Sequence, residues 1–190
     1  MTVFFILFDT AIGRCAIAWS PRGVAGVQLP ETKELTTRAR VLQRFPCARE
    51  AAAPIEVERA QDAIVALLRG EAGDLSSVLL DMDPVPPFHR RVYEAARSIP
   101  RGATMTYGAL AARAGAAGSA RAVGQALARN PFAIIVPCHR VVAAGGRIGG
   151  FSANGGTTTK LRLLAIEGHE QGAPGIFDGP CVAAQSRRKG

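Results

Sequence analysis

A proline-rich segment divides the chain into two parts with different hydrophobic patterns. The segment Asp83-Pro84-Val85-Pro86-Pro87 cannot continue a helix, because each proline lacks the backbone N–H and has a fixed φ. With 190 residues, 48% of them hydrophobic, the chain suits one large domain or two small ones. We therefore predict a domain boundary here, between an N-terminal domain over residues 1–83 and a second domain over residues 84–170.

The first part has the pattern of a small α/β domain. Apolar runs separated by turn residues predict strands at residues 3–8, 14–19 and 24–29, arranged as a three-stranded meander. Helical spacing predicts helices over residues 31–44 and 57–69. The residues expected to share a helix face are Leu35, Ala39 and Leu42 in the first, and Ala60, Ile64, Leu67 and Leu68 in the second.

The second part has mainly helical spacing. Helices are predicted over residues 88–98, 106–114, 119–129 and 159–168, with Thr106 and Ser119 as N-caps and Gly115 as a stop. The second and third of these are short and joined by a glycine-bearing turn, which is typical of a helix-turn-helix. Many helix pairs with such turns do not bind DNA, so the pattern alone leaves that function open. After residue 170, glycine, proline and basic residues predict a disordered tail over residues 171–190.

A cysteine and a histidine follow a short apolar run in this second part. The run predicts a buried strand that ends at Pro137 and holds Cys138 at the end of a rigid element. A cysteine attacks as the thiolate, and a neighbouring histidine or positive charge raises the thiolate fraction at neutral pH. The alternative is a buried core cysteine beside a surface pair formed by His139 and Arg140.

Five segments resemble, in order and approximate spacing, the signature of one protein family. Residues 130–141, Asn-Pro-x-x-x-x-Val-Pro-Cys-His-Arg-Val, are similar to the active-site sequence of the O6-alkylguanine-DNA alkyltransferases, also called methylated-DNA–protein-cysteine methyltransferases. The other four are Pro-Arg-Gly-Ala-Thr-Met-Thr-Tyr-Gly at 100–108, Ala-Arg-Ala-Val-Gly at 120–124, Gly-Gly-Phe-Ser at 149–152 and Lys-Leu-Arg-Leu-Leu-Ala-Ile-Glu-Gly at 160–168. The resemblance covers residues 88–168, and five ordered matches are very unlikely by chance.

The resemblance implies both a fold and a reaction. The fold would be an α/β N-terminal domain, a ribonuclease-H-like three-stranded sheet with helices, followed by a mainly α, winged-helix-like domain with a helix-turn-helix. The protein would flip O6-methylguanine, and also O4-methylthymine, out of DNA and transfer the alkyl group irreversibly to its own Cys138. Because a thioether does not turn over, each molecule would act once and need no cofactor. Its partner would be double-stranded DNA containing O6-alkylguanine, bound by a monomer.

Four residues match the family's catalytic positions. Cys138 resembles the alkyl acceptor, and His139 resembles the general base, linked to the thiol through a water. Glu167 resembles the carboxylate that orients the imidazole and stabilises the imidazolium, as in hydrolase triads. Tyr107 resembles the phenol that hydrogen-bonds the flipped base. Without the match, Glu167 is an ordinary surface acid at a helix end and Tyr107 an ordinary core tyrosine.

Further residues match the family's DNA-binding and pocket positions. Arg121 resembles the arginine that replaces the extruded nucleotide, where a guanidinium both stacks and hydrogen-bonds; without the match it is a solvated helix residue. The other residues expected at the DNA are Thr106, Ala122, Gly124 and Arg129. The residues expected to form the substrate pocket are Asn130, Pro137, Val141, Phe151 and Ser152. Asn130 would also tie the recognition helix to the active-site turn, and the Ser152 N–H would meet guanine O6.

The net positive charge of the chain comes entirely from its second half. Residues 1–100 carry 12 Lys and Arg against 12 Asp and Glu, whereas residues 101–190 carry 11 against 3. The formal net charge is +8, and the asymmetry survives removal of the basic run Arg187-Arg188-Lys189. A basic half beside a neutral half favours a polyanion partner, since phosphate contacts supply sequence-independent affinity. An ordinary basic surface with a basic tail would have the same composition.

The cysteines favour a reduced compartment and no metal site. Cys15, Cys47, Cys138 and Cys181 have neither the spacing of a zinc site nor the density of a disulfide framework. We expect no metal and a cytoplasmic location. The apolar run at residues 3–8 is too short for a membrane span or a signal peptide.

Two other classes of function remain open at this point. One is a non-catalytic winged-helix module that senses damage, although sensors resembling this family replace the acceptor cysteine, and Cys138 is present. The other is a Cys-His hydrolase, for which no residue pattern specifies an oxyanion hole. The pocket loop from Phe151 to Thr157 is also longer than in many relatives, which leaves the size of the accepted alkyl group open.

Overall fold

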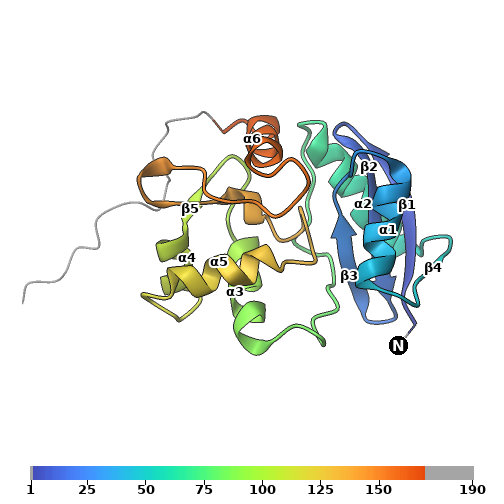
Figure 1. The fold of residues 1–190 in the computed structure, drawn as a ribbon, viewed down its shortest axis with the longest axis horizontal. Coiled ribbons are helices and arrows are strands. Elements are labelled where there is room, and N and C mark those ends of the chain that lie inside the picture. Colours follow the sequence, from blue (N-terminus) through green and yellow to red (C-terminus); the bar gives the residue numbers. More distant parts are fainter. Residues whose placement is uncertain (1, 170–190) are drawn as a thin grey trace, which may run out of the picture.

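The computed structural model describes residues 2–169, which form a mixed α/β fold (Figure 1). A sheet with two helices lies at one end of the molecule, and four further helices lie at the other. The tail expected at residues 171–190, including Cys181 and the basic run 187–189, lies outside the described residues. None of the helices in residues 2–169 is long and apolar enough to cross a membrane.

The strands predicted from the three apolar runs form an antiparallel meander. They are β1 (Phe4–Thr10), β2 (Gly13–Ser20) and β3 (Gly23–Gln28). The sheet also has a fourth strand that the hydrophobic pattern does not predict. This strand, β4 (Arg49–Glu50), pairs in parallel with β1 and gives the order β3-β2-β1-β4. Its two exposed polar residues are too few to produce an alternating pattern.

One helix covers each face of this sheet. α1 (Glu34–Arg44) packs on the face that carries Phe5 and Leu7, whereas α2 (Ile55–Leu68) packs on the opposite face. The buried face predicted for α2 is confirmed. The one predicted for α1 is wrong: Leu35 is 77% exposed, and the helix buries Thr37 and Val41 instead. Of the three residues predicted for this face, Leu42 is half-buried against the sheet, whereas Leu35 and Ala39 are exposed. Helical spacing shows which residues share a face, but the packing of the helix decides which face is buried.

The second part contains four helices, as predicted, and a short parallel ladder. The helices are α3 (Pro87–Arg97), α4 (Tyr107–Arg113), α5 (Ala120–Ala128) and α6 (Thr157–Ile166), and the ladder joins β5 (Met105–Thr106) to β6 (Val141–Val142). The Thr106 hydroxyl caps α4 by accepting the Ala109 N–H at 3.1 Å. Ser119 precedes α5, but its side chain makes no capping hydrogen bond, contrary to expectation.

The apolar run before Pro137 is not the strand that its composition predicts. It forms tight turns, with Ile134 at a φ of 71° and only single bridges at Phe132, Ala133 and Val136. The side chains of Phe132, Ile134, Ile135 and Val136 are nevertheless buried. A short apolar run indicates burial, but it does not by itself distinguish a strand from a buried turn.

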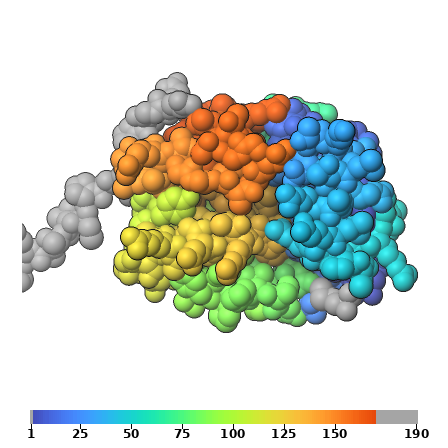
Figure 2. Space-filling model, in the orientation of Figure 1, coloured from blue at the N-terminus to red at the C-terminus, as the bar shows by residue number. Residues whose placement is uncertain are grey.

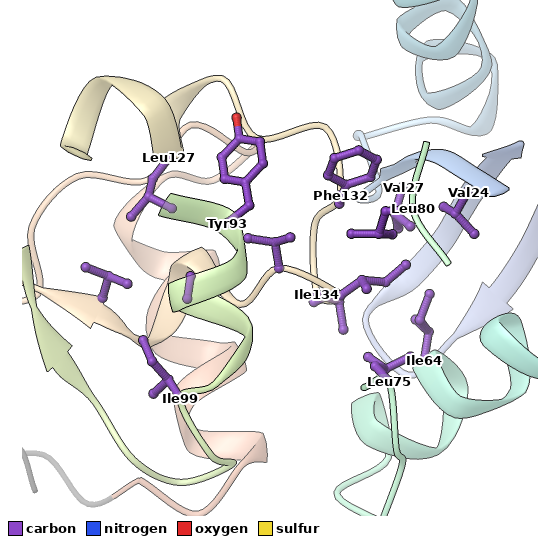
Figure 3. Close-up of a cluster of buried hydrophobic side chains, with 14 of the residues drawn as sticks. Val24, Val27, Ile64, Leu75, Leu80, Tyr93, Ile99, Leu127, Phe132 and Ile134 are labelled. Carbon is purple, nitrogen blue, oxygen red and sulfur yellow. The ribbon is translucent and has the colours of Figure 1, made fainter. Parts of the chain in front are cut away.

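These buried turns join the two parts of the molecule. Figure 3 shows Phe132 and Ile134 between the sheet residues Val24 and Val27 and the helical residues Tyr93 and Leu127. All of these residues belong to one hydrophobic cluster. The backbone joins them as well, because the Val27 N–H of β3 donates to the Pro131 carbonyl at 2.8 Å. The segment leading to Cys138 is therefore held by the edge of the sheet.

Gly26 provides a test of this attachment. A Cβ at this position would lie 3.1 Å from the Pro131 oxygen and 3.3 Å from the Phe45 ring. Gly26→Val should lower the free energy of unfolding by about 1–3 kcal/mol, as overpacking generally does, and should displace the segment before Cys138. Thermal melting measures the loss. Gly108→Ala is the control, since nothing lies within 4 Å of its added Cβ; equal melting temperatures for the two variants would contradict the close packing.

Candidate active site

Cys138 opens a short 3-10 helix, η1 (Cys138–Arg140), directly after the buried turns. Its side chain is partly buried and lies where two cavities meet. Asn130 stabilises the preceding turns from both ends: its amide donates to the Val136 carbonyl at 3.0 Å, and its oxygen accepts the Phe132 N–H at 2.9 Å. Since Asn130 follows α5, this side chain links that helix to the cysteine.

A buried ionic cluster lies behind the cysteine. Glu167, just after α6, accepts from His139 Nε2 at 2.9 Å. Arg140 binds both oxygens of the same carboxylate, with Nε and Nη2 each at 2.8 Å, and its Nη1 donates to the Ile99 carbonyl at 2.6 Å. Burial alone would raise the pKa of Glu167, but the hydrogen bonds from His139 and Arg140 outweigh it and lower the pKa to about 2. Glu167 is therefore a carboxylate at neutral pH.

This carboxylate fixes the state of the histidine. An ionised carboxylate only accepts hydrogen bonds, so His139 must carry its hydrogen on Nε2. Burial lowers the pKa of His139 more than Glu167 raises it, and the ring is therefore neutral at neutral pH. Nδ1 then has a free lone pair. Among the buried side-chain nitrogen and oxygen atoms of residues 2–169, it alone has no hydrogen-bond partner.

The environment of Cys138 favours the thiol over the thiolate. Burial raises the pKa of Cys138, although a hydrogen bond from Asn130 and the charge of Lys160 act in the opposite direction. Asn130 and Lys160 therefore favour the thiolate, as a polar group or positive charge near a cysteine does, but burial outweighs them. A nucleophilic role requires a base that removes the proton during the reaction.

The smaller of the two cavities is lined by both aromatic and small residues. Its volume is about 300 Å³, and its wall consists of Tyr107, Gly124, Leu127, Ala128, Cys138, Gly150, Phe151 and Ser152. A Cβ on Gly149 would lie 3.2 Å from the Tyr107 ring, so this glycine lets the loop lie close to the tyrosine. Burial raises the pKa of Tyr107, and a thiolate at Cys138 would raise it further. The phenol therefore keeps its proton and can donate it in a hydrogen bond.

The residues predicted to bind DNA lie on and beside α4 and α5. Arg121 and Arg129 are exposed at the two ends of α5, while Ala122 and Gly124 are half-buried on it. Figure 2 shows α5 and the loop after Cys138 on the same face of the molecule as α1. Thr106 has a structural task as the cap of α4, whatever else it contacts.

Two residues predicted for the pocket do not line it. Pro137 and Val141 are buried beside Cys138 and belong to the wall of neither cavity that reaches the sulfur. Val141 instead presents its carbonyl to Lys160, whose ammonium donates at 2.5 Å.

Sequence reasoning missed Lys160 and Arg140. Burial lowers the pKa of Lys160 to about 8, while Cys138 raises it, and the side chain is fully buried. A signal for Lys160 is present in the sequence, because Lys160, Leu163, Leu164 and Glu167 have the spacing of one helix face. Arg140 carries no comparable signal. Its partner Glu167 is 27 positions away.

The chain is similar to known proteins of one family. The family profile described as "6-O-methylguanine DNA methyltransferase, DNA binding domain" matches residues 87–169. The chain is 44% identical over 110 residues to a Thermus thermophilus protein named DNA base-flipping protein, across 58% of this chain and 72% of that protein. The crystal structure of Mycobacterium tuberculosis OGT in complex with DNA is similar with a TM-score of 0.69 and 32% identity, over 88% and 92% of the two chains. The chain belongs to the O6-methylguanine DNA methyltransferase family.

Curated methylated-DNA–protein-cysteine methyltransferases are similar to part of the chain. The methylated-DNA–protein-cysteine methyltransferase of Methanothermobacter thermautotrophicus is 43% identical over 115 residues, which are 60% of this chain and 63% of the relative. The chain thus spans less than two thirds of that relative's length. Among residues 2–169, no three His, Cys, Asp or Glu side chains are grouped as in a metal site.

Proposed function

We propose that this protein repairs DNA by transferring the alkyl group of O6-methylguanine, and also of O4-methylthymine, irreversibly to Cys138. The observation that carries the proposal is the buried Glu167–His139 pair, which leaves His139 Nδ1 as a free acceptor in the residue next to a partly buried thiol. The curated relatives named methylated-DNA–protein-cysteine methyltransferases support the reaction. Each molecule acts once, because the product is a thioether.

The proton of the thiol leaves through the histidine. We assign His139 Nδ1 as the base that takes this proton through a bound water. The Cys138 sulfur then attacks the methyl carbon, a C–S bond forms, and the bond from that carbon to guanine O6 breaks. Glu167 stabilises the imidazolium that results, as the acid of a hydrolase triad does. Since the pKa of Cys138 is raised by burial, this relay supplies the thiolate only when it is needed.

The smaller cavity is the proposed site for the extruded base. Its volume of about 300 Å³ and its aromatic wall suit a single flipped nucleobase. The Tyr107 phenol donates to the base, which eases the departure of guanine by compensating charge on the ring. Ser152 contributes its backbone N–H near O6, and Phe151 packs against the base.

The DNA would lie across α4 and α5. We propose that these helices act as a helix-turn-helix in a winged-helix-like domain over residues 84–170, and that residues 1–83 form a ribonuclease-H-like domain. The helix contacts would come from Arg121, Ala122, Gly124, Thr106 and Arg129. A crystal structure of a relative in complex with DNA supports a DNA partner. We further propose a monomer that acts in the cytoplasm on double-stranded DNA.

Incubation with a duplex that carries labelled O6-methylguanine tests this function. The proposal predicts label on the protein, in an amount that cannot exceed one methyl per molecule. Binding without transfer of label would indicate a damage sensor and refute the proposal. Absence of both binding and transfer would refute it as well.

Arg121 gives a test of base flipping. If its guanidinium fills the gap left by the flipped nucleotide, it acts only where there is a base stack to replace. Because unstacking costs a few kcal/mol, Arg121→Ala should slow transfer from duplex DNA by about tenfold or more, slow it less for single strands, and hardly change it for the free base. Single-turnover rates on the three substrates measure this. Equal losses on the free base and the duplex would remove Arg121 from the mechanism.

A further inference from the structure

The larger cavity at Cys138 extends away from α5 toward the sheet. Its volume is about 510 Å³, and it shares Cys138, Phe151 and Ser152 with the smaller cavity. Its far wall consists of β3 and α1, which contribute mostly polar residues. These are Gln28, Arg40, Gln43 and Arg44, with Glu31 from the segment between the two elements. A wall of this kind does not suit a purely apolar substituent.

The geometry of the transfer directs part of the substrate toward this cavity. In a displacement at carbon, the attacking sulfur, the carbon and the leaving oxygen lie on one line, so any larger substituent on that carbon projects sideways. With the base in the smaller cavity, as the proposed function requires, the open space beside the sulfur is the larger cavity. An alkyl chain longer than methyl would extend into it.

The charges on the far wall are not balanced. Arg40 already has two partners, because its Nε lies 3.3 Å from Glu31 Oε1 and its Nη1 donates to Gln43 Oε1 at 3.3 Å. Arg44 lies one turn further along α1 and has no hydrogen-bond or ion-pair partner among residues 2–169. The wall therefore presents two guanidinium groups and one carboxylate. A guanidinium binds a carboxylate with two parallel hydrogen bonds, which gives it specificity for that group.

We propose that this cavity is a subsite for O6-alkyl groups that end in a carboxylate, and that Arg44 is the residue that recognises the acid. The proposal rests on the proposed function. The covalent step is unchanged: the C–S bond to Cys138 forms, the bond to guanine O6 breaks, and the thiol proton goes to the departing guanine by way of His139. The terminal carboxylate takes no part in the reaction and stays on the alkylated protein.

A series of modified duplexes tests the subsite. Each carries one O6-(ω-carboxyalkyl)guanine with one to four methylene groups, or the matching neutral carboxamide, and a duplex with O6-methylguanine serves as reference. The quantity measured is the ratio of the acid rate to the amide rate at each chain length. The full-length protein is compared with Arg44→Gln and with Lys33→Gln, which removes one positive charge from an exposed residue just before the same helix.

The subsite predicts a ratio that depends on chain length and on Arg44. At the best length, Arg44→Gln should lower the acid-to-amide ratio about three- to tenfold, as expected for loss of a charge-assisted pair, and Lys33→Gln should not. An equal ratio in all three proteins at every length would overturn the proposal. So would a uniform, salt-dependent loss on every duplex in Arg44→Gln, which would indicate a phosphate contact. Failure of the proposed function itself is recognised separately, because even O6-methylguanine would then transfer nothing.

Discussion

Replacing Cys138 by serine should abolish methyl transfer and leave the binding of methylated DNA largely intact. A serine hydroxyl is too weakly acidic for the His139 relay to ionise, so we expect a rate loss of more than about a thousandfold. The exposed residues of α5 that we propose to contact DNA are unchanged by this substitution. Single-turnover transfer and DNA titration measure the two properties side by side.

Cys47→Ser is the matched control for this variant. Cys47 is exposed and lines neither cavity that reaches Cys138, so the Cys47→Ser variant should transfer methyl at the parent rate. Residual transfer by Cys138→Ser, or loss of transfer in Cys47→Ser, would show that another thiol accepts the group. Loss of DNA binding in Cys138→Ser would indicate that the substitution disturbs the fold.

Glu167→Gln should slow transfer strongly on free base and DNA alike. The amide cannot stabilise an imidazolium as the carboxylate does, and its NH2 group can place the ring hydrogen on Nδ1, where the lone pair is needed. A loss of about a hundredfold or more is expected for a disabled general base. The same change leaves the buried Arg140 guanidinium without its carboxylate, so the free energy of unfolding should fall by about 3–5 kcal/mol and the melting temperature by about 10 °C.

Arg140→Met separates the relay from the stability of the cluster. It removes the same buried ion pair but leaves Glu167 hydrogen-bonded to His139. Its melting temperature should fall about as far as that of Glu167→Gln, while its transfer rate falls much less. The pH–rate profile of Glu167→Gln should also differ in shape from that of the parent. If the two profiles coincide, or if both variants lose rate equally, the relay is wrong.

The same carboxylate sets the acid stability of the parent protein. Its pKa in the folded chain is about 2, below the ordinary value of 4.5, so its contribution is fully present above pH 4.5 and is lost as the pH falls toward 2. His139 adds a separate effect with its own direction. It is held neutral by burial, and the unfolded chain therefore binds more protons once the pH falls below about 6.5. The Glu167→Gln variant should not show the loss of stability between pH 4.5 and 2, because it has no carboxylate to protonate.

The sequence predicts the parts of the fold in which periodic patterns are long. The three strands of the meander and the helices of the second part appear where their apolar spacing places them. Two of the errors have a common origin, since the positions of Leu35 of α1 and of the turns before Pro137 depend on what packs against them. The apolar pattern predicted that Leu35 is buried, but it faces solvent. The pattern also predicted a strand before Pro137, but this segment is buried as turns.

The candidate site was predictable only where its residues are adjacent or match a known signature. Cys138 and His139 are neighbours, and Glu167 and Tyr107 came from the resemblance to the family. The protonation state of Cys138 was not predictable, because its raised pKa results from burial in the folded protein. The role of Arg140 requires a contact across 27 positions, and the guanidinium groups of the larger cavity lie on α1, in the other part of the molecule.

Mass spectrometry of the protein after reaction tests the central claim most directly. An excess of the parent protein is incubated with a duplex that carries a single O6-methylguanine, and the intact mass and the proteolytic peptides are then measured. The account predicts one added methyl group per repaired base, carried by the peptide that contains Cys138, together with unmodified guanine in the DNA. A methyl group on Cys15, Cys47 or Cys181, or repaired DNA beside a protein of unchanged mass, would contradict it.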